Sequence, residues 1–482
     1  MDTSESLRQI FYPRSVAVLG ASTDPSKYGN QILKVLVDDK YRGKIYPINP
    51  KSPEVLGVKA YPSMLDVPEP VDLAMVVIPA RMTPQAIKEC AEKEVKGAVV
   101  ITAGFSEIGE EGKALEEELV REARNGGIRI IGPNCFGIIN TDPVVRLNAM
   151  PGSLIERPGP VAFVSQSGAL AEAVVAWAQE QGIGFSKFVS IGNMSDIDFA
   201  DMMLYLADDP KTKVITMYIE GIKNGRRFLD AARRVTLRKP VVVLKAGRYS
   251  AATRAVTSHT GSFAGSDKIY DAAFRQSGIV RVEGIEDLFD AARALGSQPV
   301  PRGNCVGVIS HAGGPMVMTC DACESNGLEL PTISKSTESE LRKALPHYAA
   351  VGNPTDVVAD APLTRYNEAL EIFCKDESLD SIIAVIEGLT CGDGVLDQQK
   401  WPDTLGNTLK VCKKPSLVLW MFAQSRIKEG VQNFEKLDIP VYASPERVAK
   451  AMKALASYGV YLRDANESTV LLRDQTVVEK AD

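Results

Sequence analysis

His259 is the residue whose type and surroundings most favour covalent chemistry. The chain has three histidines, at positions 259, 311 and 347, and His259 lies in the hydroxyl-rich segment TSHTGS, residues 257–262. A neutral imidazole attacks phosphorus well near neutral pH, and a carboxylate bound to its second nitrogen can orient the ring and stabilise its cation. Glu220, which ends the predicted strand VITMYIE, is the carboxylate that topology places best. Taken alone, His259 fits a surface loop equally well, and Glu220 fits a solvated or capping carboxylate.

The turn after the first predicted strand, GAS at residues 20–22, could bind the phosphates of a nucleotide-like ligand. Glycine permits close approach to the backbone, the N–H groups of the next helix attract phosphate, and Lys27 and Lys51 could neutralise it. The turn lacks the full G-x-G-x-x-G spacing, so NAD itself is weakly supported. A tight turn with two surface lysines is an equally good interpretation of this motif alone.

The segment SQSGAL, residues 165–170, predicts a second anion site where a strand meets an apolar helix. Ser167 is expected to cap that helix and, with Gly168, to help hold a phosphate. Ser165 stands where the first glycine of the G-x-S-x-G nucleophile elbow should be. A serine hydrolase is therefore disfavoured.

The elements that must position these residues are parallel sheets. Short β-branched runs alternate with helical segments along the whole chain, which predicts an α/β fold with mainly parallel sheets. At roughly 150 residues per domain, the 482 residues predict about three domains. Proline-rich turns set the predicted boundaries, giving domains at 1–150, 151–298 and 299–463 and a polar, loose tail at 464–482.

The composition excludes several classes of protein. Apolar residues make up 45% and charged residues 24%, as in ordinary soluble α/β proteins. The net charge of −6 gives no reason to bind nucleic acid. No segment is apolar enough for a membrane span or signal peptide, so we expect a cytoplasmic protein that does not contact membranes. The eight cysteines lack zinc-site spacing, so we expect reduced thiols and no metal site on this chain.

Taken together, these loops resemble those of the NDP-forming acyl-CoA synthetases, the superfamily that includes succinyl-CoA synthetase. The resemblance is strongest to α subunits of ADP-forming acetyl-CoA synthetases. It extends from about residue 5 to 460 and rests on GASTDPSKYG, INPK, ITAGFSE, GPNCFG, SQSGAL, IEG and SHTGS in this order. It implies a Rossmann-like CoA-binding domain followed by two flavodoxin-like domains of the succinyl-CoA synthetase type.

The resemblance assigns roles to the matching positions. His259 would become phosphohistidine, Glu220 would stabilise it, and Ser167 with Gly168 would hold the phosphate. Gly192 and Asn193, in the IGNMSD loop, would contact the acyl group. The residues implied to line the CoA site are Gly20, Ala21, Ser22, Lys27, Tyr28, Gly29, Asn49, Pro50, Lys51, Ile78, Pro79, Ala80, Ala103, Gly104, Phe105, Ser106, Glu107, Asn134 and Cys135.

The implied activity is that of an acid–thiol ligase, acyl-CoA + ADP + phosphate ⇌ carboxylic acid + CoA + ATP, running through an acyl phosphate and phosphohistidine. The 482 residues contain no ATP-grasp domain. The resemblance therefore implies a separate ATP-grasp β subunit that carries ADP or ATP and Mg²⁺, in an αβ or α2β2 complex. The preferred acyl group and the physiological direction are left open.

Two rival interpretations differ in class or family. A non-catalytic CoA-binding regulatory protein of the same fold is the main alternative, and the intact His259 and Glu220 argue against it. Succinyl-CoA synthetase itself is disfavoured because the extra domain at 300–460 is foreign to its short α subunit. In that domain His311, in SHAGGP, stands where the family pattern predicts asparagine or another small polar residue, and a turn histidine without a chemical task is the simpler expectation.

Overall fold

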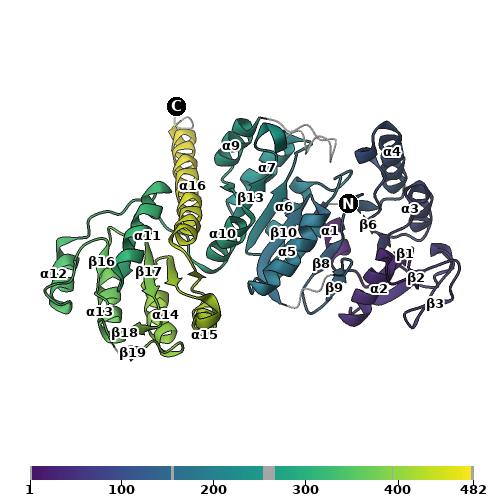
Figure 1. Ribbon diagram of the computed structural model, residues 1–482. Helices are drawn as coiled ribbons and strands as arrows, with labels where there is room; N and C mark the ends of the chain where they lie inside the picture. The colour runs from purple at the N-terminus through teal and green to yellow at the C-terminus, as the bar shows by residue number, and fades with distance from the viewer. Residues whose placement is uncertain (1–2, 153–156, 253–265, 393, 479–482) are drawn as a thin grey trace. The chain divides into compact units, whose positions relative to one another are not determined.

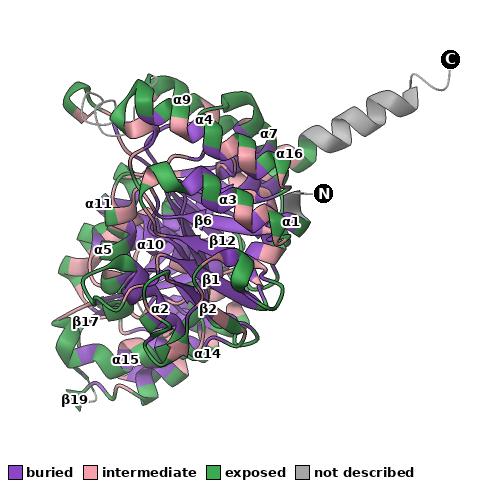
Figure 2. Ribbon diagram, turned by 90° about the vertical axis from the view of Figure 1, so that its right-hand side faces the viewer, coloured by how far each residue is buried: buried purple, intermediate pink, exposed green. Residues whose placement is uncertain are grey.

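The computed structural model describes residues 3–152, 157–252, 266–392 and 394–478. They form two compact units, Met1–Glu283 and Gly284–Asp482, each built from helices packed on mainly parallel sheets (Figure 1). The α/β fold class predicted from the alternating segments is confirmed. Strands such as β1, β6 and β12 are buried, whereas the surrounding helices expose one face (Figure 2). None of the helices within the described ranges is long and apolar enough to span a membrane.

The first sheet has five parallel strands in the order β2-β1-β5-β6-β7. Their order reverses between β1 and β5, and such a reversal opens a crevice at the carboxyl ends of the strands. The strands of this sheet are β1 (Ser15–Leu19), β2 (Lys44–Ile48), β5 (Leu73–Val76), β6 (Gly97–Val100) and β7 (Arg129–Ile131). Its helices are α1 (Thr3–Phe11), α2 (Tyr28–Asp38), α3 (Thr83–Glu92) and α4 (Glu110–Asn125). The shorter elements are β3 (Glu54–Val55), β4 (Val58–Lys59), η1 (Met64–Asp66), η2 (Ala80–Met82) and η3 (Ser106–Ile108).

Alternate residues of the first sheet face two different hydrophobic cores, as the period of a strand requires. Val16 and Val18 of β1 pack with residues of α1 and α2. Ala17 and Leu19 pack on the opposite face with residues of α3 and α4. Both faces of the sheet are therefore covered, which explains why its strands are almost continuously apolar.

The second sheet has seven strands in the order β14-β13-β12-β10-β11-β8-β9. Its five parallel strands again reverse order, between β10 and β12, while β8 pairs antiparallel with both β11 and β9. The strands are β8 (Ile138–Asn140), β9 (Leu147–Ala149), β10 (Pro158–Ser165), β11 (Phe185–Ser190), β12 (Val214–Ile219), β13 (Val241–Lys245) and β14 (Val280–Val282). The helices are α5 (Gly168–Glu180), α6 (Phe199–Asp208), α7 (Gly225–Thr236) and α9 (Asp267–Gln276).

The hairpin of β8 and β9 lies in the sequence range predicted as the first domain, yet it extends the second sheet. Ile138 and Ile139 are buried and pair with Val189 and Phe188 of β11, so the hairpin covers its apolar side chains in that position. One hydrophobic core, moreover, runs from α1 and α2 to α6 and the second sheet. The first two sheets therefore form one compact unit.

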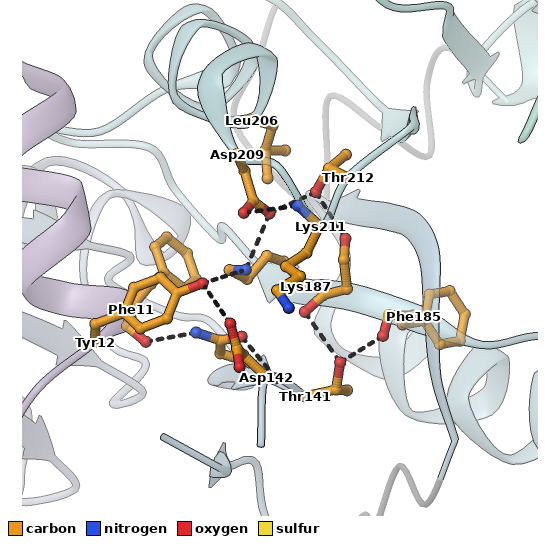
Figure 3. A network of polar contacts seen from close by, with 12 residues as sticks. Phe11, Tyr12, Thr141, Asp142, Phe185, Lys187, Leu206, Asp209, Lys211 and Thr212 are labelled. Carbon is orange, nitrogen blue, oxygen red and sulfur yellow. Dashed lines mark hydrogen bonds and ion pairs between the residues drawn. The ribbon is translucent and has the colours of Figure 1, made fainter. Parts of the chain in front are cut away.

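A buried polar network also ties the N-terminal helix to the second sheet (Figure 3). Lys187 of β11 is fully buried, forms an ion pair of 3.0 Å with Asp209 and lies 3.4 Å from the hydroxyl of Tyr12. Burial lowers the pKa of Lys187, although the Asp209 carboxylate acts against this. Burial alone would raise the pKa of Asp209, but hydrogen bonds from Thr212 and Lys187 lower it. The partners stabilise each other as ions in the interior.

The second unit contains a third five-stranded parallel sheet, in the order β16-β15-β17-β20-β21. The strand order reverses between β15 and β17, as it reverses once in each of the two other sheets. The strands are β15 (Val306–Ser310), β16 (Thr355–Asp356), β17 (Ser381–Glu387), β20 (Ser416–Met421) and β21 (Val441–Tyr442), with the small hairpin β18 (Thr390–Cys391) and β19 (Gly394–Val395). The helices are α10 (Ile285–Ser297), α11 (Gly313–Ser325), α12 (Lys335–Ala344), α13 (Leu363–Cys374), α14 (Lys400–Cys412), α15 (Gln424–Lys436) and α16 (Pro445–Val478).

Two parts of the second unit bear on the domains expected from sequence. Helix α10, which the predicted break at 298 assigns to the second domain, falls in the second compact unit by its contacts. Arg447 of α16 holds it through two hydrogen bonds of 2.7 and 2.8 Å to Asp290. Helix α16 continues to Val478 through most of the expected loose tail. Residues 464–478 contain no glycine or proline that would end a helix.

His311, expected as a turn histidine, is buried. It follows β15, and its Nε2 lies 3.3 Å from the carbonyl oxygen of Glu387. The rings of Tyr366 and Trp401 each lie 5.9 Å from the imidazole, centre to centre. Burial lowers the pKa of His311, so the ring is neutral near pH 7. The side chain thus packs in an aromatic cluster of the third sheet.

Candidate active site

An outer cavity of about 900 Å³ opens at the carboxyl ends of β1 and β5, where the first sheet reverses its strand order. Its walls come from the turns that follow β1, β2 and β5 and from helix α3. Residues in the lining that the resemblance assigned to CoA are Gly20, Ala21, Ser22, Lys27, Tyr28, Gly29, Asn49, Pro50, Lys51 and Ile78. The cavity combines apolar walls, close backbone approach and two lysines, which suits a phosphorylated nucleotide with an apolar arm.

Glycine is required at two positions of this outer cavity. Gly20 has a φ of +94°, which L side chains rarely adopt. A Cβ atom on Gly29 would lie 2.0 Å from the carbonyl oxygen of Gly20. Asn49 joins two of the turns, because its Nδ2 donates to the Ala21 carbonyl at 2.8 Å and its Oδ1 accepts from Lys51 N at 2.8 Å. The backbone of these turns is therefore held in place without a ligand.

An inner cavity of about 490 Å³ lies between the loops of the first and second sheets. It shares Tyr28, Val77 and Ile78 with the outer cavity, so the two are adjacent along one wall. The predicted site residues in its own lining are Ala103, Ser106, Asn134, Cys135, Ser167, Gly168, Gly192 and Asn193. Tertiary folding thus brings the predicted phosphate and acyl positions beside the predicted CoA positions.

Helix α5 directs its N-terminus at the inner cavity. Ser167 is the N-cap, and its Oγ accepts a hydrogen bond of 3.3 Å from Leu170 N. Gly168 is the first helical residue, and Ser167, Gly168 and Ala169 all line the cavity. The unpaired N–H groups of a first helical turn carry partial positive charge and attract anions. Because the side chain of Ser167 caps the helix, the backbone amides of Gly168 and Ala169 remain available to bind an anion.

Asn193 is held at the inner cavity from both sides of its amide. Its Nδ2 donates to Glu107 Oε2 at 2.8 Å and to Glu116 Oε2 at 2.9 Å. Its Oδ1 accepts from Asn134 Nδ2 at 3.2 Å. The neighbouring Gly192 has a φ of +57°, and a Cβ atom there would lie 2.3 Å from Pro133 O. The loop is therefore pinned against the first domain's loops.

Glu116 of α4 is the buried carboxylate that organises this network. Burial alone would raise its pKa, but hydrogen bonds from Ser106, Ser195 and Asn193 lower it. The Ser106 hydroxyl donates at 2.7 Å. Glu116 is therefore an anion that positions Ser195 and two residues of the inner cavity lining, Ser106 and Asn193, and it does not itself line that cavity.

Glu220 is buried at the carboxyl end of β12, on the turn that the side chain of Gln166 supports. Gln166 Oε1 accepts hydrogen bonds from Glu220 N at 2.9 Å and Gly221 N at 3.1 Å. Burial, and then the charge of Glu220, raise the pKa of Tyr218 to about 12. Glu220 lines neither cavity, whereas Gln166 lines the inner one. His259, its predicted partner, lies outside the described residues.

Lys245 braces the same turn from the end of β13. Its Nζ donates to the carbonyl oxygen of Glu220 at 2.8 Å and to that of Ala246, and lies 4.6 Å from the centre of the Tyr270 ring. Burial lowers the pKa of Lys245 to about 8, although the carboxylates of Asp267 and Glu220 act in the opposite direction. A buried cation thus supports the Glu220 turn and the beginning of the segment that leads to residue 259.

Some residues assigned to CoA lie in neither cavity wall: Pro79, Ala80, Gly104, Phe105 and Glu107. Phe105 is fully buried in the core beside α3 and α4, so its side chain cannot contact a ligand. Glu107 Oε1 accepts from Gly104 N at 2.6 Å and from Phe105 N at 3.1 Å, which fixes the loop. Cys135 does line the inner cavity, but burial raises the pKa of its thiol to about 12, so it is no nucleophile.

Four residues of this region were not assigned a role from sequence: Glu116, Gln166, Lys223 and Lys245. The sequence could have pointed to Gln166 and Lys223, because Gln166 precedes the assigned Ser167 and Lys223 lies three residues after the assigned Glu220. It could not have pointed to Glu116 and Lys245, since a glutamate in a charged helix and a lysine at a strand end are commonplace. Among the described residues, no cysteine pairs in a disulfide and no cluster of side chains suits a metal ion.

Three family models match the chain in succession. A CoA binding domain matches residues 14–141, a succinyl-CoA ligase like flavodoxin domain matches 158–295, and a ligase-CoA domain matches 306–389. Together with the sheets, these matches define the class as a CoA ligase of the succinyl-CoA ligase type, and they confirm the predicted order of domain types.

Full-length relatives narrow the class. The α subunit of ADP-forming acetate–CoA ligase II from Pyrococcus furiosus is 45% identical over 450 residues, covering 93% of this chain and 97% of the relative. The ADP-forming acetate–CoA ligase I of Archaeoglobus fulgidus is 40% identical over 452 residues, or 94% of this chain and 64% of that protein. A dinucleotide forming acetyl-coenzyme A synthetase 1 of Ca. Korarchaeum cryptofilum, solved with phosphate and ADP, matches with a TM-score of 0.87 and 39% identity over 95% of this chain and 98% of that one. The chain therefore belongs to the family of ADP-forming acetyl-CoA synthetases, as an α-subunit type chain.

Proposed function

We propose that this chain and a separate ATP-grasp β subunit catalyse acyl-CoA + ADP + phosphate ⇌ carboxylic acid + CoA + ATP. CoA binds in the outer cavity, and phosphate and the acyl group meet in the inner cavity. The observation that supports this assignment is the wall of Tyr28, Val77 and Ile78 that the two cavities share, because the thioester end of a CoA bound in the outer cavity could then reach the α5 N-terminus.

The first step takes place at the inner cavity. An oxygen of phosphate attacks the thioester carbonyl carbon, the C–O bond forms, the C–S bond breaks, and the CoA thiolate takes up a proton. The amides at Gly168 and Ala169 hold the phosphate, while Asn193, fixed by Glu107 and Glu116, shapes the acyl side. The product is an acyl phosphate and free CoA.

The second step moves the phosphoryl group to His259. The P–N bond forms as the acyl P–O bond breaks, which releases the carboxylate, and the phosphohistidine then passes the group to ADP. Glu220 orients the imidazole and stabilises the cationic ring. Support for this role is its place on a turn braced by Gln166 and Lys245. A carboxylate that is already held in place needs little reorganisation to bind the imidazolium.

The nucleotide site is assigned to the partner. The relative from Pyrococcus furiosus is named as an α subunit, which implies a β subunit, and the longer relative from Archaeoglobus fulgidus has 36% of its length beyond the part spanned here, by subtraction from 64%. We assign ADP or ATP with Mg²⁺ to an ATP-grasp β chain in an α2β2 complex. Light scattering of the co-purified complex measures that stoichiometry.

The proposed activity is tested by co-expression with an ATP-grasp β subunit. The complex should form ATP from acetyl-CoA, ADP and phosphate, and γ-³²P-ATP should label this chain with an acid-labile, alkali-stable phosphate. A panel of acyl-CoAs then defines the preferred acid. CoA binding without label or turnover would instead support the regulatory alternative.

Replacing Gly29 with alanine is expected to weaken CoA binding by at least about tenfold, since the new Cβ would clash with the Gly20 carbonyl and displace the turn. Calorimetric titration of CoA into the purified chain measures the effect. Gly225→Ala is the matched control, because no atom lies within 4 Å of a Cβ added there. Unchanged CoA affinity in Gly29→Ala would remove the turn from the CoA site.

A further inference from the structure

Lys223 is the one charged side chain in the described lining of the inner cavity. The other lining residues are apolar, hydroxyl, amide, thiol or glycine residues, and none is a carboxylate. Lys223 lies on the turn between β12 and α7, three residues after Glu220. Of the two groups assigned to this cavity, phosphate enters as an anion and the acyl group leaves as a carboxylate, so a positive charge here favours the binding of both.

The ammonium of Lys223 is available to a ligand. No hydrogen bond from Nζ to a described residue is present, and Glu116 Oε1, its carboxylate neighbour, is 3.9 Å away. Glu116 already accepts hydrogen bonds from Ser106, Ser195 and Asn193. An ion pair of this length with a 49% exposed lysine contributes little, so the pair does not explain where the ammonium lies.

We propose that Lys223 binds inorganic phosphate in the inner cavity and holds it for attack on the thioester. This inference deepens the proposed function and rests on it. The N-terminus of α5 supplies only about half an elementary charge, whereas phosphate near pH 7 carries between one and two negative charges. A lysine on the adjoining turn supplies the missing full charge and up to three donors.

The local electrostatics agree with such a role. Partial burial lowers the pKa of Lys223, although the carboxylates of Glu116 and Asp198 act against this. An incompletely solvated ammonium gains more from an incoming anion than a fully hydrated one does. Lys223 and Glu220 also share one turn, which Gln166 anchors. The same backbone therefore positions the ammonium that binds phosphate and the carboxylate that orients His259.

The test replaces Lys223 with methionine, glutamine or arginine in the αβ complex. We expect Lys223→Met and Lys223→Gln to raise the KM for phosphate by about 10- to 100-fold, with the KM values for acetyl-CoA and ADP within about twofold of wild type. Lys223→Arg should recover most of the affinity for phosphate. Lys113→Met, an exposed lysine of α4 outside every described cavity lining, is the matched control and should behave as wild type.

A second measurement is independent of turnover. Equilibrium dialysis of ³²P-phosphate against the full α chain should show the same loss in Lys223→Met, while calorimetry shows unchanged CoA binding and hence an intact fold. Equal phosphate binding by wild type and both neutral variants would overturn the inference, as would a wild-type chain that binds no phosphate. A wild-type chain that binds phosphate through Lys223 in a complex that makes no ATP would instead contradict the proposed function alone.

Discussion

Replacing His259 with asparagine is expected to lower ATP formation by roughly four orders of magnitude or more, because the phosphoryl group then has no covalent carrier between acyl phosphate and ADP. Asparagine keeps a polar side chain of similar size but has no basic nitrogen to attack phosphorus. The measurement is the rate of ATP formation from acetyl-CoA, ADP and phosphate by the αβ complex. Labelling by γ-³²P-ATP should disappear together with turnover.

CoA binding separates loss of chemistry from loss of structure in this variant. CoA occupies the outer cavity in our proposal, so its affinity should remain that of wild type. His347→Asn is the matched control, since His347 is an exposed histidine of the second unit with no assigned role. A His259→Asn complex that kept forming ATP at the wild-type rate would end the phosphohistidine proposal, whatever its affinity for CoA.

Replacing Lys187 with methionine is expected to destabilise the first unit by about 3–5 kcal/mol, because it leaves the Asp209 carboxylate buried without its counter-ion. Lys187 and Asp209 are 0% and 2% exposed, so water cannot take the place of the lost ammonium. The hydrogen bond to Tyr12 is lost as well, and with it one tie between α1 and β11 (Figure 3). Urea denaturation followed by circular dichroism measures the change.

Two further variants isolate the contribution of the buried charge. Lys187→Met combined with Asp209→Leu should recover much of the lost stability, because an apolar pair leaves no unpaired ion behind. Lys34→Met removes a lysine from the exposed ion pair with Asp38 and should unfold at the urea concentration of wild type. If Lys187→Met also unfolded there, the buried pair would have no stabilising role.

Many of the residues that line the two cavities could be predicted from local motifs. Glycine at positions 20 and 29, the Ser167 cap and the Asn193 loop follow from turn and capping chemistry, which depends on neighbouring residues in the chain. The structure places them around two adjoining cavities. Phe105 shows the limit of such inference, since a residue inside a matching motif turns out to be core.

Contacts between distant segments decided the rest. Glu116 and Asn193 are 77 residues apart in sequence, and Lys245 and the Glu220 carbonyl are 25 apart, so no local pattern connects them. The same holds for the β8–β9 hairpin, which joins the second sheet and covers its isoleucines there. His311, expected as a plain turn residue, is buried since three aromatic rings meet at one sheet edge.

By itself, the sequence determined the α/β class and predicted which turns would hold anions and which histidine would carry phosphorus, because periodicity and turn chemistry are local properties. Only the tertiary structure decided that the two cavities share a wall, that Glu116 and Lys245 act as buried supports, and that Lys223 is part of the lining of the inner cavity. These are properties of side chains brought together by strand order and by a common hydrophobic core, and the packing of the whole unit sets them.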